Sequence, residues 1–336
     1  MTKRICLKDI AQKVGVSTAL VSYVLNNKRL DRISKDIAQK IKDTAHELNY
    51  SINHIARSLK TKKTLTIGLI VADISNSFSS TLARIIEDEA EKNNYTVIFG
   101  SSDEDAEKSL KLINLLLNHQ VDGLIIAPSE NSASQITYLQ EKEIPFVLID
   151  RYFPGLNTNY VAIDNYKAAY TITKYLAAQN FHKLAFITYE KGLFNLQERK
   201  RGFLAALEET DLKVNDLWIR EVGNKNIGRE VERAIDELLA LTEPPDCILF
   251  ASNTLSTYGL KYINTLPLKV PHDIEIASFD ESDAAQLFYS PITYIKQPLI
   301  KMGQLATQLL LECIEDITTI RQVNLEAELV VGKHLI

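Results

Sequence analysis

Residues 7–26 read Leu-Lys-Asp-Ile-Ala-Gln-Lys-Val-Gly-Val-Ser-Thr-Ala-Leu-Val-Ser-Tyr-Val-Leu-Asn. Apolar residues recur at helical spacing on both sides of Gly15, which predicts two short amphipathic helices. Gly15 stands where the turn between them requires a positive φ, and Ser17 is a suitable N-cap for the second helix. Small Ala11 allows the helices to approach closely, with Val21 packing against it. Two helices joined in this way predict a helix-turn-helix unit.

A third helix is predicted to follow, with Ser34 as its N-cap. Its inward face is expected to consist of Ile37, Ile41, Ala45 and Leu48. Together the three helices predict a small all-α domain over residues 1–50.

Charge separates this head from the rest of the chain. Residues 1–63 hold fourteen Lys and Arg against five Asp and Glu, a net of +9. The remaining residues hold 24 against 38, a net of −14. A basic head on an acidic body indicates a polyanion partner for the head, because contacts with phosphates release condensed counterions.

The segment after the head is basic and weakly helical. Residues 50–64 read Tyr-Ser-Ile-Asn-His-Ile-Ala-Arg-Ser-Leu-Lys-Thr-Lys-Lys-Thr, too short for a stable isolated helix. The chain here resembles the lactose-repressor (LacI/GalR) family of bacterial transcription regulators. The matching stretches are Leu7-Lys-Asp-Ile-Ala, Val14-Gly-Val-Ser, Val21-Ser, Asn26, Glu47-Leu-Asn-Tyr-Ser, Ala56-Arg-Ser-Leu-Lys and Ile67-Gly-Leu-Ile.

The resemblance implies that residues 51–64 are a hinge segment that becomes helical on operator DNA. Two hinge helices would pair there, and Leu59 of each would wedge into the minor groove and kink the duplex. The hinge residues expected at the DNA are Asn53, His54, Arg57, Ser58 and Leu59.

The start of the second helix is expected to read the bases in the major groove. Thr18 and Ala19 are suited to contacts with thymine methyl groups, and Arg29 to a guanine or a phosphate. Tyr23 is the third position that matches a base-reading residue of the family, and the other residues of the head expected at the DNA are Lys8, Ser17, Ser22 and Asn26.

From Leu65 onward, short β-branched runs alternate with helical stretches, which predicts an α/β body with parallel sheets covered on both faces. Strands are predicted near 65–72, 95–100, 122–127, 145–149, 160–163, 183–188, 246–251 and 274–279. About 270 residues exceed one comfortable domain, so two lobes are expected.

The resemblance implies a body like the periplasmic sugar-binding proteins, with effector binding and dimerisation in residues 65–336. Its chain would cross between the lobes three times. The N-lobe is expected at about 65–163 and 293–321, and the C-lobe at about 164–292 and 322–336.

Ligands of such sheets bind at the carboxyl ends of the strands. The polar residues at predicted strand ends, together with those that match effector positions of the family, give one candidate set: Asp73, Asn76, Phe78, Ser79, Ser129, Asp150, Arg199, Asn253, Asp280 and Gln297. Any single Asp in this set has the alternative role of a helix N-cap, and Arg199 with Asp280 has the alternative of an ordinary ion pair. The family often has Asn-Asp where this chain has Asn253-Thr254.

The function implied is a homodimeric repressor that binds a pseudo-palindromic operator under the control of a small ligand. Carboxylates and Arg forks suit the hydroxyl groups of a carbohydrate. One alternative is control by a sugar phosphate or a phosphorylated partner protein. A more distant one is an enzyme on a doubly wound scaffold.

Several features of other protein classes are not found in the sequence. No signal peptide, membrane-spanning run, metal-ligand spacing or phosphate-binding loop is recognised, so a cytoplasmic protein without a cofactor, a membrane partner or enzymatic activity is expected. Cys6, Cys247 and Cys313 are expected to be buried thiols in a reducing compartment.

Overall fold

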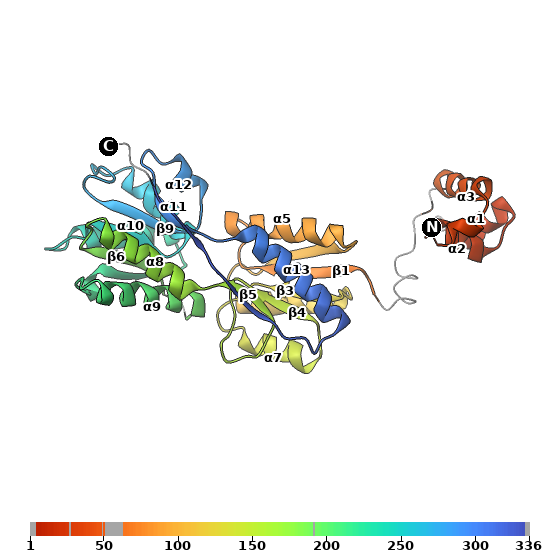
Figure 1. Cartoon of the computed structure of the whole chain (residues 1–336), viewed down its shortest axis with the longest axis horizontal. Coiled ribbons are helices and arrows are strands. Elements are labelled where there is room, and N and C mark those ends of the chain that lie inside the picture. Colours follow the sequence, from red (N-terminus) through yellow and green to blue (C-terminus); the bar gives the residue numbers. More distant parts are fainter. Residues whose placement is uncertain (1–4, 27, 49, 51–62, 191, 333–336) are drawn as a thin grey trace. The chain divides into compact units, whose positions relative to one another are not determined.

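The structure is a computed structural model that describes residues 5–26, 28–48, 50, 63–190 and 192–332. It divides into two compact units, a head at residues 1–64 and a body at residues 65–336. The elements are drawn in Figure 1.

The head contains the three predicted helices, α1 (Leu7–Val14), α2 (Thr18–Leu25) and α3 (Lys35–Glu47), with a short 3-10 turn at Leu30–Arg32. Gly15 adopts φ +80°, as the turn requires, and the Ser17 hydroxyl accepts a hydrogen bond from the Leu20 N–H at 3.2 Å. The core consists of Ile10, Ala11, Val21, Val24, Ile41 and Ala45. The helix-turn-helix prediction is confirmed.

One prediction about α3 is wrong. Ile37 is 38% exposed, and Ala38 packs against the core in its place. Ile37 lies in the first turn at the edge of the apolar stripe, where α1 and α2 do not cover it. Ser34 occupies the N-cap position, but its side chain makes no capping hydrogen bond.

The N-lobe of the body is built on a parallel sheet of strand order β11-β5-β4-β3-β1-β2. Its strands are β1 (Thr66–Val71), β2 (Thr96–Ser101), β3 (Gly123–Ile126), β4 (Phe146–Ile149), β5 (Tyr160–Ile163) and β11 (Gln322–Leu325). Its helices are α5 (Ser77–Lys92), α6 (Ala106–Asn118), α7 (Ala133–Glu141) and α13 (Leu299–Glu315).

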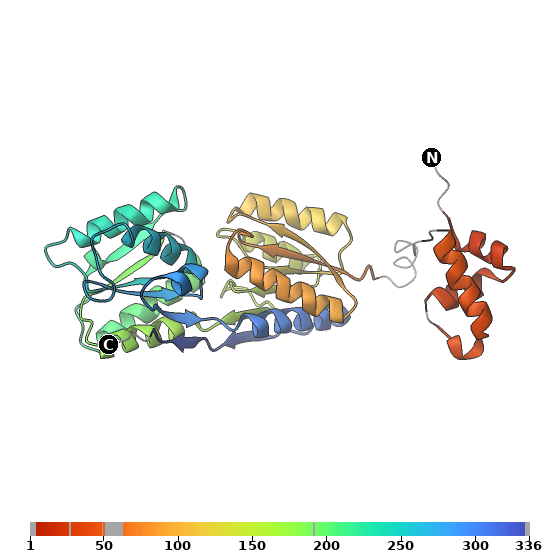
Figure 2. The ribbon, with the colours of Figure 1, turned by 90° about the horizontal axis from the view of Figure 1, so that it is seen from above.

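The C-lobe has a second sheet of order β12-β10-β9-β8-β6-β7, in which only β12 runs antiparallel. Its strands are β6 (Leu184–Tyr189), β7 (Ile219–Val222), β8 (Cys247–Phe250), β9 (Glu275–Phe279), β10 (Thr293–Lys296) and β12 (Glu328–Val330). Its helices are α8 (Asn165–Ala178), α9 (Phe194–Glu209), α10 (Ile227–Leu239), α11 (Asn253–Ile263) and α12 (Asp283–Leu287), with a 3-10 turn at Asp216–Trp218. Figure 2 shows the two lobes side by side.

The predicted fold class is confirmed, but two lobe boundaries move by one strand. β10 pairs with β9, so it belongs to the C-lobe, and the second crossover follows Lys296 rather than preceding Thr293. β11 pairs with β5, so it belongs to the N-lobe, and the third crossover follows Leu325. Both strands lie where the chain crosses between the lobes. The sheet that such a strand joins depends on its hydrogen bonds to a strand distant in the sequence, and the local hydrophobic pattern does not show it.

Four strands were not predicted: β7, β10, β11 and β12. β7 reads Ile-Arg-Glu-Val and lies at the edge of its sheet, with only Val222 buried. Its central charges hide the apolar pattern that marks a buried strand.

Cys247 and Cys313 are buried as expected, whereas Cys6 is exposed at the start of α1.

Candidate functional site: a cavity between the lobes and an exposed recognition helix

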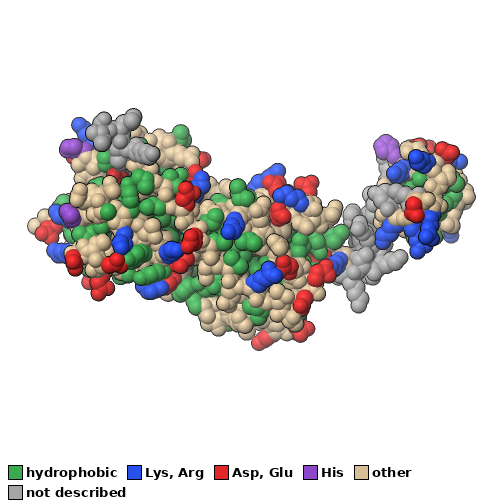
Figure 3. Space-filling model, in the orientation of Figure 1, with side chains coloured by type: hydrophobic (Ala, Val, Ile, Leu, Met, Phe, Trp, Pro, Cys, Tyr) green, Lys and Arg blue, Asp and Glu red, His purple; other side chains and the backbone are tan. Residues whose placement is uncertain are grey.

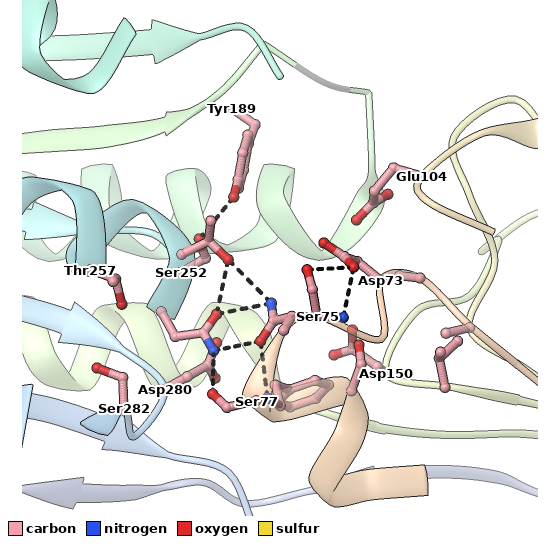
Figure 4. A pocket seen from close by; sticks show the side chains of 18 of the residues that line it. Asp73, Ser75, Ser77, Glu104, Asp150, Tyr189, Ser252, Thr257, Asp280 and Ser282 are labelled. Atoms are coloured by element: carbon pink, nitrogen blue, oxygen red, sulfur yellow. Dashed lines mark hydrogen bonds between the residues drawn. The ribbon is translucent and has the colours of Figure 1, made fainter. Parts of the chain in front are cut away.

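A cavity of about 590 Å³ lies where residues from the carboxyl ends of strands in both sheets come together (Figure 4). Nine of the ten candidate residues line it: Asp73, Asn76, Phe78, Ser79, Asp150, Arg199, Asn253, Asp280 and Gln297. The fold therefore brings together residues that are up to 224 positions apart in the sequence. This agrees with the rule that open parallel sheets bind ligands at the carboxyl ends of their strands.

Ser129 is the exception. Its side chain is fully buried and donates a hydrogen bond to the Ser102 hydroxyl at 3.1 Å, and its carbonyl accepts one from Ser132 at 2.7 Å. Ser129 is not among the residues that line the cavity. It stands three residues beyond β3, far enough for the chain to turn its side chain into the N-lobe. The structure therefore does not bring Ser129 to the cavity with the other nine candidates.

Arg199 is held in place by neutral acceptors. Its side chain is only 2% exposed, and it donates from Nε to Asn165 Oδ1 at 2.8 Å and from Nη1 to the Ala251 carbonyl at 2.6 Å. The guanidinium lies 4.2 Å from the centre of the Phe279 ring. Burial lowers the pKa of Arg199, and the charge of Asp280 opposes this shift.

Asp280 is held by a different partner. Gln297 Nε2 donates to Asp280 Oδ1 at 2.6 Å, and in the described part of the chain no ion pair joins Asp280 to Arg199. Asp280 has φ +69° and precedes α12, whose N-cap is Ser282. Asp280 is therefore neither the N-cap of a helix nor the partner of Arg199 in a direct ion pair.

Asp150 follows β4 and is 8% exposed. Burial raises its pKa, although the charge of Arg151 acts in the opposite direction. Asp150 Oδ2 lies 3.5 Å from Arg151 Nε, while Asp150 Oδ1 has no hydrogen-bond partner. Arg151 donates two hydrogen bonds to the Glu104 carboxylate, at 2.8 and 2.7 Å.

The residues after β1 shape the N-lobe wall. Asp73 Oδ1 accepts bonds from the Ser75 N–H and hydroxyl at 2.9 and 2.8 Å, which closes a local turn. Figure 4 shows both side chains at the cavity. Asn76 is the N-cap of α5, and its Oδ1 accepts from the Phe78 N–H at 2.9 Å. Ser79, in the first turn of α5, is 7% exposed.

Sequence reasoning missed several lining residues. Tyr189 ends β6, and its hydroxyl accepts a bond from Ser252 at 3.3 Å; burial raises its pKa. The strand-end rule would have found Tyr189, because it stands where Asp73 and Asp150 stand on their strands. Asn195, at the start of α9, is 6% exposed and its Oδ1 has no partner. No local pattern distinguishes Asn195 from a surface residue.

The head presents α2 as an exposed helix. Ser17, Thr18, Ala19 and Arg29 are exposed, as is Lys8 on α1, while Ser22, Tyr23 and Asn26 are half-buried. The Arg29 guanidinium lies 5.2 Å from the Tyr23 ring centre. Asn26 donates from Nδ2 to the Ser22 carbonyl at 2.8 Å and so closes the end of α2. Several Lys and Arg side chains lie on the visible face of the head in Figure 3.

The predicted hinge contacts Asn53, His54, Arg57, Ser58 and Leu59 lie outside the described residues.

Within the described ranges, none of the helices has the length and apolar character to span a bilayer. The same ranges contain no cluster of His, Cys, Asp and Glu that could hold a metal ion.

Residues 64–331 match the family described as periplasmic binding proteins and sugar binding domain of the LacI family. Residues 6–53 match the bacterial regulatory proteins of the lacI family.

Similar proteins include "Probable HTH-type transcriptional regulator EndR" of Paenibacillus polymyxa, 32% identical over 92% of this chain and 90% of EndR. The ribose operon repressor of Haemophilus influenzae is 30% identical, with 92% of each chain covered.

Among solved structures, the lac repressor dimer bound to operator and the anti-inducer ONPF matches with a TM-score of 0.85. It is 21% identical and covers 98% of this chain and 99% of its own. The transcription regulator CcpA of Lactococcus lactis matches with a TM-score of 0.72 and 26% identity, over 80% of this chain and 97% of its own.

Proposed function

Because this chain belongs to the LacI family and is therefore a DNA-binding transcriptional regulator under ligand control, we propose that its effector is a small neutral carbohydrate bound in the cavity between the lobes. The operator would be pseudo-palindromic, and the protein would bind it as a homodimer in the cytoplasm. Effector occupancy would change the angle between the lobes and thereby the affinity for the operator.

The observation that carries the ligand proposal is a set of unpaired acceptors. Asp150 Oδ1, Asn195 Oδ1 and Gln297 Oε1 all line the cavity, are buried and lack a hydrogen-bond partner. A buried polar atom without a partner costs about 1–3 kcal/mol, so a ligand that supplies donors gains this energy on binding. Hydroxyl groups of a carbohydrate are such donors, and Arg199 supplies a donor for a ring or hydroxyl oxygen.

The charge of the cavity disfavours the sugar-phosphate alternative. Six lining residues are acidic, namely Asp73, Asp103, Glu104, Asp150, Asp280 and Asp283, against three that are basic, Arg151, Arg199 and Lys261. Arg151 is already neutralised by Glu104. A phosphate would therefore enter a cavity of net negative charge, where repulsion is strengthened by the low local dielectric.

For the DNA, we propose that Thr18 and Ala19 contact base edges. Tyr23 is the third base-reading position, and Arg29 would reach a guanine or a phosphate. The docking of α2 would be supported by Lys8, Ser17, Ser22 and Asn26. The exposure of Thr18, Ala19 and Arg29 supports this. The hinge roles of Asn53, His54, Arg57, Ser58 and Leu59 rest on the resemblance alone.

The test of the ligand is a thermal-shift screen of the full-length protein with pentoses, hexoses, disaccharides and their phosphates. A ligand that binds only the folded form raises the melting temperature. A neutral sugar that raises it, and whose phosphate ester does not, supports the proposal. Stabilisation by phosphate esters alone would contradict it, and so would stabilisation by none of these compounds.

A further inference from the structure

Two asparagines join the lobes across the cavity. Asn76 caps α5 in the N-lobe, and Asn253 is the first residue of α11 in the C-lobe. Asn76 Nδ2 donates to Asn253 Oδ1 at 3.2 Å, and Asn253 Nδ2 donates back to Asn76 Oδ1 at 2.7 Å. The pair is therefore a reciprocal amide bridge between two rigid elements of different lobes.

The hydrogen-bonding capacity of both side chains is fully used. Asn76 also donates to Thr254 Oγ1 at 3.2 Å and accepts from the Phe78 N–H at 2.9 Å. Asn253 also donates to Ser77 Oγ at 3.4 Å and accepts from Thr254 Oγ1 at 3.5 Å. A primary amide offers two donors and two acceptor sites, so neither residue has one left for a ligand. The dashed lines near Ser77 in Figure 4 belong to this network.

The saturated pair contrasts with Asp150, Asn195 and Gln297, whose acceptors are unpaired in the same cavity. A ligand can donate hydrogen bonds to those three acceptors without breaking any bond within the protein. It can bond to the Asn253 side chain only if the hydrogen bonds between Asn76 and Asn253 break. We propose that the Asn76–Asn253 pair is an interlobe latch that fixes the lobe angle seen in this structure, so that any ligand using Asn253 must release it. That this release controls operator binding rests on the proposed function.

The lobes also touch at a second place. The Gly192 N–H donates to Glu130 Oε1 at 2.7 Å, and the Tyr152 and Phe194 rings meet edge to face with centroids 5.2 Å apart. These contacts offer the competing explanation for a fixed lobe angle, and the experiment must separate the two.

The experiment measures the distance between spin labels in the full-length protein without any ligand. Labels are placed at exposed positions of the two lobes through Lys111→Cys and Glu232→Cys, in a Cys6→Ser background, because Cys247 and Cys313 are buried. Asn76→Asp retains a side-chain acceptor for the Phe78 N–H and so preserves the cap. It removes both amide donors and places a carboxylate against Asn253 Oδ1. The expected result is a longer and broader distance distribution than in the wild type.

Asn93→Asp makes the same chemical change at the other end of α5, where the Asn93 side-chain amide donates to the Glu89 carbonyl within the same helix, and should leave the distribution unchanged. Glu130→Gln tests the competing contact. An unchanged distribution in Asn76→Asp overturns the latch, whether or not Glu130→Gln alters it. Failure of the proposed function is a separate result, since it appears as a sugar screen without stabilisation and does not affect this distance.

Discussion

Asp280 and Ser129 both follow buried strands, yet they have different surroundings. Asp280 lines the cavity beside Gln297, whereas Ser129 bonds to Ser102 inside the N-lobe. A polar residue after a buried strand thus lines the cavity in one case and makes a hydrogen bond inside the lobe in the other.

This difference predicts opposite effects of substitution. Asp280→Asn should weaken effector binding by about tenfold or more, because hydrogen bonds to charged groups contribute about 1.5–3 kcal/mol and 1.4 kcal/mol is a factor of ten. Calorimetric titration with the sugar that passes the thermal screen measures this. Ser129→Ala should leave the affinity unchanged and lower the free energy of unfolding by about 1 kcal/mol. Equal affinities of wild type and Asp280→Asn would remove Asp280 from the site.

The raised pKa of Asp150 predicts a pH dependence of stability. Burial disfavours the ionised carboxylate, so Asp150 lowers the stability of the empty protein as the pH rises through its folded-state pKa. Asp150→Asn should therefore unfold at higher denaturant concentration than the wild type at neutral pH. The gap should narrow as the pH falls towards the ordinary pKa of 3.8 and close below it, where the carboxyl is protonated in both states. Urea unfolding between pH 4 and 8 tests this, and a gap independent of pH would contradict it.

At the scale of elements, the packing of α9 on α8 positions Arg199. A Cβ on Gly202, three residues after Arg199 in α9, would lie 2.2 Å from the Tyr166 carbonyl oxygen of α8. Only a residue without a side chain permits this approach, and the approach places Arg199 Nε beside Asn165 of the same α8.

Gly202→Ala should force the two helices apart. Overpacking of this kind costs about 1–3 kcal/mol, and it should also weaken effector binding by moving Arg199. The midpoint of thermal unfolding and the sugar affinity report the two effects. Gly223→Ala is the matched control, because a Cβ there meets no atom within 4 Å. If both variants retain wild-type stability, the close approach is not required.

At the scale of the whole molecule, the head and the body are separate compact units with opposite charge. We expect their functions to be separable by substitution. Leu59→Ala should weaken operator binding, because an apolar wedge helps to kink the duplex, while the sugar affinity stays unchanged. Operator binding at fixed salt and calorimetry of the sugar measure the two properties. Unaltered operator affinity would remove the hinge role of Leu59.

The sequence by itself determined the head and the α/β class of the body, and nine of the ten candidate residues, some of them taken from the family resemblance, line the cavity. It did so because helical periodicity, a left-handed turn at Gly15 and the carboxyl ends of parallel strands are local features with fixed geometric consequences. Only the tertiary structure decided which sheet β10 and β11 join, since strand pairing there is between distant segments. It also decided that Ser129 turns inward, that Asn195 faces the cavity, and that Asn76 and Asn253 saturate each other. Such contacts depend on side-chain direction across separate elements, which no local pattern in the chain encodes.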